Sequence, residues 1–398
     1  MNIIYISKYA SYAPYGIETR HVYISKELVK RGNEVKLYIS NANHQLSLVP
    51  KLYEDKIEGV DIEWLNTLKY KRAYGAKRIL SWIHFEIILR RKLHKLSNVP
   101  DLVIVSSLSL LSILNGIWLK KTYGCKLVFE IRDIWPLVLT RISSLSKKNP
   151  MYKVLEYIEK KGYSESDLII GTMPNLKEHV DGVVPNKKVV WIPHLINPSI
   201  IHERKHTYEK ELGELRKTKN TKLIAYAGSI NKSSSIEILL KAASIMKHED
   251  IIFVFLGNGP LLSTLQTKYS QENIRFFDKI RQSEVVAFLS DCDILYDGYL
   301  ESDIYRYGNS RNKYVEYCLA SKPIVVSYDG YPFFVSEYDC GLVVKPESEE
   351  ELVKAFQLLV QKDDEELNQL GRNALNFAQT NLRIDKQVDK LLEDIKSV

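Results

Sequence analysis

Short apolar runs recur along the chain, and most are followed by a segment with apolar residues at helical spacing. A run of roughly four to eight apolar residues is typical of a strand buried on both faces, and strands that alternate with helices predict a parallel sheet. The expected strands lie within 2–6, 35–39, 60–65, 101–107, 126–133, 167–173, 222–243 and 251–260. The pattern predicts an α/β protein built on doubly wound parallel sheets.

The pattern starts twice along the chain. A polar, highly charged run at 202–221 interrupts it, after which a strand, a glycine turn and a helix follow in the same order as before. A chain of 398 residues is long enough for two domains with separate cores. We therefore expect Rossmann-like domains at 1–198 and 222–380, joined by a linker at 199–221. Ligands of such sheets bind beyond the carboxyl ends of the strands.

The segment 305–331 combines a glycine-bearing loop, a helix and a buried strand. The loop at 308–311 can cap the helix with a side chain and leave backbone N–H groups free for a phosphate. On the helix, Lys313 and Glu316 are three residues apart and share a face. Its apolar stripe is formed by Val315, Cys318 and Leu319. An ammonium can neutralise a diphosphate and a carboxylate can bind both ribose hydroxyls, although a surface ion pair worth only ~0.3–0.5 kcal/mol is the alternative.

Composition indicates a soluble globular protein, with 45% hydrophobic residues and a net charge of +7. No stretch approaches the ~20 apolar residues that span a bilayer, and the N-terminal MNIIYIS runs into a strand rather than a signal peptide. The cysteines lack metal-ligand spacing, as expected for buried thiols in a reducing compartment; they are Cys125, Cys292, Cys318 and Cys340. We expect a cytoplasmic protein whose charge permits phosphate, nucleic acid or anionic lipid as a partner.

The segment between Leu68 and Ser97 is strongly basic, with nine Lys or Arg residues and one acid, Glu86. The basic residues are Lys69, Lys71, Arg72, Lys77, Arg78, Arg90, Arg91, Lys92 and Lys95. Apolar residues that include Trp and Phe are interleaved with them, which is typical of a helix lying on an anionic membrane. The predicted membrane and acceptor patch consists of Lys77, Arg78, Trp82, Arg90 and Arg91. A core-facing helix with a solvated basic edge would show the same pattern, and no recognisable nucleic-acid module accompanies it.

Two further motifs contain acidic residues. The motif EIRDIWP at 130–136 ends a predicted strand, where Arg132 could bind phosphate and Asp133 could accept a sugar-hydroxyl proton; the two could instead pair with each other. Asp291-Cys292-Asp293 has the D-x-D form of a metal site. It stands at a helix-to-strand junction like those at Asp101 and Asp167, so turn and cap chemistry is the simpler interpretation, and we predict no metal.

Residues 312–325, NKYVEYCLASKPIV, resemble the (S/N)K-x-x-EYxAxGKPIV segment of retaining glycosyltransferases of family 4. The resemblance implies that Glu316 binds the ribose of a sugar nucleotide. Many members carry a second glutamate eight residues earlier, where this chain has Gly308. The motif at 130–136 resembles E-x-RDxWP, found in a subgroup that transfers N-acetylated sugars for surface polysaccharides. The implied fold is GT-B, two Rossmann-like domains facing a cleft, with a last helix at 381–398 that crosses back to the first domain.

The same resemblance carries over a set of donor-binding residues. In the family, a first loop with two adjacent glycines lies beside the donor phosphates, and only Gly16 is present here. A second turn supports the diphosphate, and a third region lies near the base. The implied nucleotide-sugar contacts are Gly16, Gly228, Ser229, Lys232, Gly257, Arg281, Ser310, Asn312, Lys313 and Glu316, with Ile280 beside Arg281.

The function implied is transfer of a sugar from a UDP-sugar, with retention, to a lipid-linked saccharide or polyprenyl phosphate at the inner leaflet. No cofactor beyond the donor substrate and no nucleic acid are expected. We assign catalytic roles to Arg132, Asp133 and Lys313, the last stabilising charge on the departing diphosphate. Two alternatives remain: a UDP-sugar 2-epimerase of the same fold, and a degenerate, non-catalytic assembly partner, which Gly308 and the single-glycine loop favour.

Overall fold

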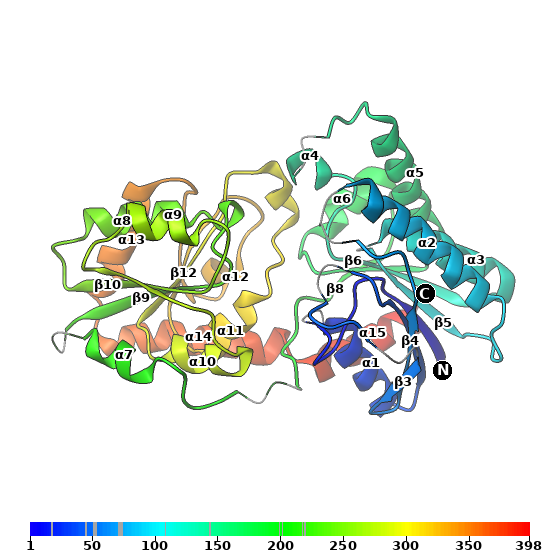
Figure 1. Cartoon of the computed structure of the whole chain (residues 1–398), viewed down its shortest axis with the longest axis horizontal. Coiled ribbons are helices and arrows are strands. Elements are labelled where there is room, and N and C mark those ends of the chain that lie inside the picture. Colours follow the sequence, from blue (N-terminus) through cyan, green and yellow to red (C-terminus); the bar gives the residue numbers. More distant parts are fainter. Residues whose placement is uncertain are drawn as a thin grey trace. The chain divides into compact units, whose positions relative to one another are not determined.

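A computed structural model describes the chain except for residues 17–18, 44–45, 51–53, 71–74, 108, 143–144, 199, 201, 217 and 219. The described residues form two compact units, each built around one β-sheet (Figure 1). The first unit contains residues 1–197 together with 384–398, and the second contains 198–383.

The sheet of the first unit has eight strands in the order β3-β4-β2-β1-β5-β6-β7-β8. All neighbours are parallel except β3 and β4, which form an antiparallel pair at one edge. The strands are β1 (Asn2–Ile6), β2 (Glu34–Ser40), β3 (Glu54–Ile57), β4 (Val60–Leu65), β5 (Leu102–Ser106), β6 (Lys126–Ile131), β7 (Leu168–Gly171) and β8 (Val189–Trp191). The predicted parallel sheet is therefore confirmed, with an added edge strand that the apolar pattern did not reveal.

Helices cover both faces of this sheet (Figure 1). On one face lie α1 (Arg20–Lys30) and α15 (Ile384–Lys396), and on the other lie α2 (Ala76–Leu93), α3 (Ile113–Tyr123) and α5 (Pro150–Glu165). Three shorter helices complete the unit: η1 (Leu110–Ser112), α4 (Leu139–Ile142) and α6 (Leu176–Val183). None of the described helices is long and apolar enough to cross a membrane.

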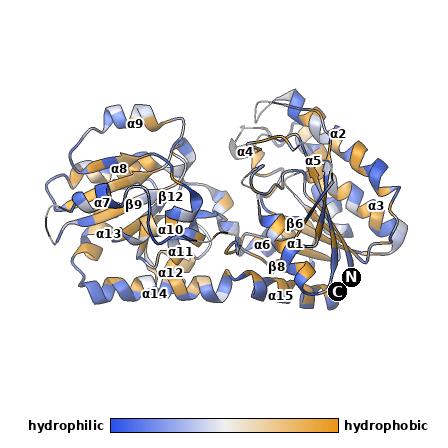
Figure 2. Ribbon diagram, turned by 60° about the horizontal axis from the view of Figure 1, so that its bottom comes forward, coloured by the Kyte–Doolittle hydropathy of each residue, from blue (hydrophilic) through white to orange (hydrophobic). Residues whose placement is uncertain are grey.

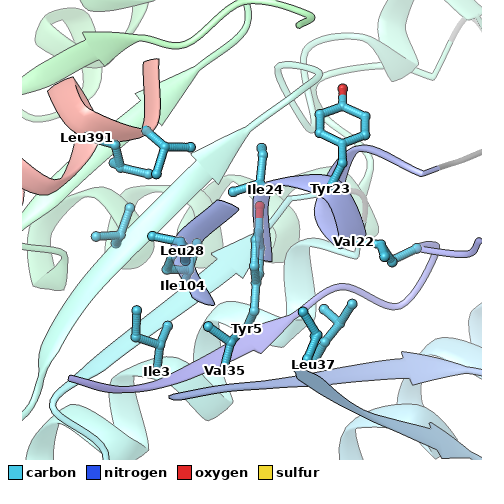
Figure 3. Close-up of a cluster of buried hydrophobic side chains, with 14 of the residues drawn as sticks. Ile3, Tyr5, Val22, Tyr23, Ile24, Leu28, Val35, Leu37, Ile104 and Leu391 are labelled. Carbon is cyan, nitrogen blue, oxygen red and sulfur yellow. The ribbon is translucent and has the colours of Figure 1, made fainter. Parts of the chain in front are cut away.

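The last helix belongs to the core of the first unit. Apolar residues of α15 recur at positions 384, 388, 391 and 395, which places them on one helical face. Leu391 packs with Leu28 of α1 above Ile3, Tyr5 and Ile104 of the sheet (Figure 3). These side chains are at most 2% exposed, so burial of apolar surface holds this C-terminal segment against strands from the start of the chain. Ion pairs of Arg31 with Asp389 and of Lys188 with Asp394 add to it.

The second unit has a six-stranded sheet of parallel strands in the order β11-β10-β9-β12-β13-β14. The strands are β9 (Lys222–Ala227), β10 (Ile251–Leu256), β11 (Ile274–Phe277), β12 (Ile294–Gly298), β13 (Ile324–Ser327) and β14 (Gly341–Val344). Figure 2 shows hydrophobic residues gathered in the strands of each sheet, while the helices carry hydrophobic and hydrophilic residues side by side. That distribution is expected of strands covered on both faces.

The helices of the second unit form a layer on each face of its sheet (Figure 1). In chain order they are α7 (Glu209–Glu214), η2 (Lys232–Ser234), α8 (Ile236–Ile245), α9 (Leu262–Lys268), α10 (Gln282–Ser290), η3 (Asp303–Tyr307), α11 (Lys313–Leu319), α12 (Phe334–Glu337), α13 (Glu349–Val360) and α14 (Asp364–Asn381). Helix α8 contacts α13, whereas α11 contacts both α10 and α14. Because β10, β9 and β12 are adjacent parallel strands, the loops at their carboxyl ends lie at the same edge of the sheet.

Candidate functional site

The second unit contains a cavity of about 380 Å³ beyond the carboxyl ends of β9 and β10. This is the edge at which open parallel sheets bind ligands, and the volume suits a small molecule. The cavity is lined by Ala227, Gly228, Ser229, Leu256, Gly257, Asn258, Lys279, Ile280, Val285, Asn312, Lys313, Glu316 and Tyr317. Seven of the nucleotide-contact residues expected from the sequence, counting Ile280, therefore line one pocket together with residues that the sequence did not single out.

Two glycines allow the turns after β9 and β10 to touch through their backbones. A Cβ atom added to Gly257 would lie 1.9 Å from the carbonyl oxygen of Gly228, well inside van der Waals contact. Both residues have φ +146°, a conformation that favours glycine. The Gly228 N–H donates to the carbonyl oxygen of Leu256 over 2.9 Å. The wall of the pocket here is bare backbone, which lets a ligand approach closely.

Two lysines, Lys279 and Lys313, line the pocket, and Lys313 is the one beside the glycine turn. Its Nζ atom lies 2.9 Å from Oδ1 of Asp297 and 3.9 Å from the centre of the Tyr226 ring. A Cβ atom on Gly228 would come within 3.0 Å of this Nζ, so the ammonium sits directly beside the glycine turn. An ammonium has three N–H donors, which leaves donors available for an anion after the bond to Asp297.

Glu316 supplies the negative charge of the same pocket. Its Oε1 atom accepts a hydrogen bond from the Gln282 side chain over 3.1 Å. The carboxylate that holds Lys313 is Asp297 and not Glu316, so the simple surface pair considered from the sequence does not describe these two residues. A half-buried carboxylate and an ammonium thus line one cavity without using each other as partners, and each can contact a different part of a ligand.

Asp297, at the end of β12, was missed by the sequence analysis. Its side chain is fully buried and accepts hydrogen bonds from Arg311, Lys313 and Tyr314. Burial alone would raise the pKa of this carboxyl, but the two neighbouring cations and the tyrosine hydroxyl hold the pKa below its ordinary value. The only sequence signal was a single acid in the otherwise apolar strand ILYDG, and a buried charge of this kind requires partners.

The start of α11 differs from expectation. The helix begins at Lys313, and its N-cap residue, Asn312, makes no side-chain cap hydrogen bond, so the predicted hydroxyl or amide cap is wrong. The predicted apolar stripe is also shifted, because the buried face consists of Tyr314, Tyr317 and Cys318. Tyrosine rings can occupy a core when their hydroxyls find partners: the Tyr317 hydroxyl accepts from the Ala227 N–H over 3.0 Å and donates to the Tyr296 carbonyl over 2.8 Å.

Replacing Tyr317 by phenylalanine should lower the free energy of unfolding by about 1–3 kcal/mol, because the Ala227 N–H and the Tyr296 carbonyl would stay buried without this partner. Chemical denaturation measures the change. Tyr338→Phe is the matched control, since Tyr338 is 47% exposed in the same unit and should change stability by less than about 0.5 kcal/mol. Equal effects of the two substitutions would contradict the structural role of the Tyr317 hydroxyl.

The remaining donor residues predicted in this unit do not line the pocket. Arg281 lies just before α10, with its side chain 71% exposed and paired with Glu203 and Glu284. Its neighbour Ile280 lines the pocket instead. Lys232 is exposed at the start of η2, and the Ser310 hydroxyl is buried with no hydrogen-bond partner among the described residues.

The first unit holds the other candidates. Gly16 forms an isolated antiparallel bridge with Leu46. Arg132 and Asp133 follow β6 at the carboxyl edge of the sheet. Arg132 is buried and its backbone N–H donates to the Ser107 hydroxyl over 3.0 Å, whereas Asp133 is exposed. Asp133 is therefore the residue of this pair that reaches the surface.

Glu130, the first residue of the same motif, is a structural residue. Its carboxylate is fully buried and accepts hydrogen bonds from Arg20 over 3.0 Å and from the Tyr5 hydroxyl over 2.9 Å, while His21 lies 3.3 Å away. Arg20 also donates to the carbonyl oxygens of Ile192 and Pro193. Glu130 therefore links β6 to β1, α1 and the end of β8, and it is not available to a substrate.

The predicted basic patch on α2 is divided by the structure. Arg78 and Trp82 donate hydrogen bonds to the Tyr9 hydroxyl, and Arg90 donates to the Asn115 side chain. Of the five predicted residues, Lys77 and Arg91 are exposed. The large apolar residues exposed on α2 are Ile79, Leu80, Ile83 and Ile87. Lys71 and Arg72 lie outside the described residues. The helix therefore shows an apolar exposed face with basic residues beside it, but its tryptophan is not part of that face.

Both aspartates of the D-x-D sequence, Asp291 and Asp293, accept hydrogen bonds from other residues of the second unit. Oδ2 of Asp293 accepts from the Leu223 N–H over 2.7 Å and from Arg216 over 2.9 Å. Asp291 accepts from His206 over 3.0 Å. Local bonding at the start of β12 accounts for both carboxylates.

Comparison with known proteins agrees with this arrangement. Residues 14–200 match the family model Glycosyltransferase Family 4, and residues 207–377 match Glycosyl transferases group 1. The chain carries the two domains of a GT-B glycosyltransferase. The boundaries of the two matched regions lie close to those of the two compact units.

Individual relatives are distant. The chain is 24% identical over 193 residues to "Probable glycosyltransferase WbjE" of Pseudomonas aeruginosa, a match that spans 44% of this chain and 45% of that relative. Its fold resembles sucrose-phosphate synthase of Thermosynechococcus elongatus, with TM-score 0.75, 16% identity, and coverage of 100% of this chain and 99% of that one. It also resembles Anabaena Alr3699/HepE in complex with UDP, with TM-score 0.67, 14% identity and complete coverage of both chains. The GT-B fold predicted from the sequence is therefore confirmed.

Proposed function

We propose that this GT-B protein transfers a sugar, of the N-acetylated class, from a UDP-sugar to a lipid-linked or saccharide acceptor in polysaccharide biosynthesis. The observation that carries the proposal is the pocket of the second unit, where Lys313, Glu316 and the Gly228 turn converge. The resemblance of the chain to a probable glycosyltransferase and to a fold solved with UDP supports it.

Each side chain of this pocket has a chemical role in the proposal. The Glu316 carboxylate accepts hydrogen bonds from the ribose hydroxyls, and the Lys313 ammonium contacts the diphosphate. As the sugar departs, negative charge grows on the diphosphate oxygen. Lys313 stabilises that charge, and the Gly228 turn allows the phosphates to approach the backbone. The sugar is transferred with retention at the anomeric carbon.

Acceptor binding belongs to the first unit in this proposal. Asp133 is exposed at the carboxyl edge of the sheet, next to the buried Arg132, and its carboxylate can accept a hydrogen bond from an acceptor hydroxyl. The motif that contains both residues also supports the choice of an N-acetylated sugar, through its resemblance to the E-x-RDxWP subgroup.

We also propose that the first unit rests on the anionic inner face of the cell membrane. Leu80, Ile83 and Ile87 follow one another at helical spacing on α2 and are 46–54% exposed. On the same face of the sheet, α5 exposes Met151, Val154 and Tyr157. Exposed lysines and arginines stand beside both sets, at Lys77, Arg91, Lys153 and Lys160. Such a combination of apolar and basic residues binds anionic lipid surfaces.

Titration calorimetry with UDP, GDP and ADP tests the donor, followed by an assay of UDP release from a panel of UDP-sugars with lipid-linked saccharide acceptors. Selective UDP binding and acceptor-dependent UDP release are expected. Release of a free, altered UDP-sugar without acceptor would indicate an epimerase. Binding without any turnover would indicate a non-catalytic partner, and no nucleotide binding would contradict the proposal.

The membrane proposal predicts that the protein cosediments with vesicles containing phosphatidylglycerol and less with pure phosphatidylcholine, and that added salt weakens the binding. Ile83→Asp combined with Ile87→Asp should lower the partition coefficient at least about tenfold, because two apolar side chains would no longer enter the membrane. Ile245→Asp is the control, since Ile245 is 55% exposed on α8 of the other unit. Equal binding by all three proteins would contradict the proposed surface.

A further inference from the structure

Asp297 is placed to act on Lys313 and not on a ligand. Its side chain is fully buried, and the carboxylate receives two contacts from Arg311, of 2.7 and 2.8 Å, one from Lys313 at 2.9 Å and one from the Tyr314 hydroxyl at 2.7 Å. These contacts come from three donor atoms that surround a carboxylate with 0% exposure, so a substrate hydroxyl cannot reach it.

Arg311 is likewise turned away from the pocket. Besides Asp297, its guanidinium donates to the carbonyl oxygens of Gly298 and Ser233, over 2.9 and 3.0 Å. Its plane lies over the ring of Tyr299, with 3.6 Å between the guanidinium carbon and the ring centre. Arg311 does not line the cavity, whereas Lys313 does. The Arg311 guanidinium therefore stabilises the fold and does not contact the ligand pocket.

The charges of this cluster decide what reaches the pocket. Asp297 paired with Lys313 alone would be neutral, and a neutral pair attracts a diphosphate weakly. Arg311 adds a second positive charge, so the cluster of Asp297, Arg311 and Lys313 carries a net charge of +1, and Lys313 is its member that lines the pocket. Lysine has a long flexible stem, and holding it in one conformation in advance removes that entropy cost from ligand binding.

We propose that Asp297 is a positioning residue that fixes the Lys313 ammonium at the pocket wall, and that Arg311 is the counter-charge that leaves Lys313 free to attract an anion. The identification of that anion as a nucleotide diphosphate rests on the proposed function. The positioning itself depends only on contacts among these three side chains.

The test compares the native protein with the double variant Asp297→Asn and Arg311→Gln. This exchange removes one charge of each sign, so the net charge of the cluster stays at +1 while the anchor of Lys313 is lost. Two readouts are followed: UDP affinity by calorimetry, and the rate at which Lys313 is acetylated by an N-hydroxysuccinimide ester, measured by peptide mass spectrometry. Exposed Lys232 of the same unit is the internal reference.

In the double variant, we expect Lys313 to be acetylated several-fold faster relative to Lys232, and UDP affinity to fall about tenfold, the order expected for restraining a lysine side chain on binding. In a Lys313→Met background, the same double exchange should change UDP affinity less than about twofold, because the residue through which Asp297 acts is already absent. If the double exchange lowers UDP affinity as much in the Lys313→Met background as in the native protein, the proposal is overturned.

The labelling readout separates this inference from the proposed function. If the native protein binds no UDP, the proposed function fails, and faster acetylation of Lys313 in the double variant still supports the positioning role. Unchanged acetylation overturns it. Should the double variant not fold, as judged by its unfolding transition, Asp297→Asn alone is labelled in its place, with the same two outcomes.

Discussion

Replacing Glu316 by alanine should weaken UDP binding ten- to a hundredfold. The side chain lines the pocket of the second unit and has one oxygen bonded to Gln282, so its carboxylate is available to ribose hydroxyls. Loss of a charge-assisted hydrogen bond costs on the order of 1.5–3 kcal/mol, which corresponds to that range of affinity. Titration calorimetry of the two proteins with UDP measures the effect.

The matched control is Glu350→Ala, which removes an exposed glutamate of α13 in the same unit. It should leave UDP affinity within about twofold of the native value. Two further ligands add a second check. With 2′-deoxy-UDP, which lacks a ribose hydroxyl, Glu316→Ala should reduce the affinity less than it does with UDP. With uridine, which lacks the phosphates, the reduction should persist. An equal loss of affinity for all three ligands would contradict a contact between Glu316 and the ribose.

The second large effect concerns stability. Changing Glu130 to glutamine should lower the free energy of unfolding of the first unit by about 3–5 kcal/mol, because Arg20 would remain buried without its counter-charge. Glu58→Gln is the control: that carboxylate pairs with Lys26 at the surface and is 64% exposed, so its loss should cost less than about 1 kcal/mol. Urea denaturation followed by tryptophan fluorescence reports on both.

The same carboxylate gives a pH signature. Burial alone would raise the pKa of Glu130, but Arg20 and the neighbouring His21 hold it well below its ordinary value. The folded pKa is therefore lower than the unfolded one, near 4.3. The stabilisation is present above the unfolded pKa and is lost as pH falls through the folded pKa. The difference in stability between native protein and Glu130→Gln should be constant around pH 7 and shrink below about pH 4; a difference that grows with acid would contradict this assignment.

The candidate site shows where sequence reasoning succeeded. Four residues that were identified from the sequence line one pocket, although up to 88 residues separate them along the chain: Gly228 and Gly257 in two turns, and Lys313 and Glu316 on helix α11. Lys313 and Glu316 were found because a charged pair at helical spacing is a local pattern, whereas the roles of Gly228 and Gly257 were implied by the family resemblance. Adjacent parallel strands bring these segments to one edge of the sheet.

Other residues were misjudged because their partners lie far along the chain. The sequence predicted a surface patch that includes Arg78, Trp82 and Arg90. In the structure, the first two donate hydrogen bonds to Tyr9 and the third donates to Asn115. Arg281 stands next to a pocket residue, but pairs with Glu203. The sequence does not show whether a basic or aromatic side chain points to solvent or to a buried hydroxyl. Only the packing of distant segments decides which orientation it takes.

The amino-acid sequence by itself determined the alternation of strands and helices, the two parallel sheets and the glycine turns that open the pocket, because each depends on the spacing of residues within one short segment. The tertiary structure alone decided that Asp297, and not Glu316, holds Lys313, and that the buried Glu130 joins four elements of the first unit. A buried charge is stable only when it is paired with an opposite charge. The pairing depends on which distant segments pack together, and the sequence alone does not show it.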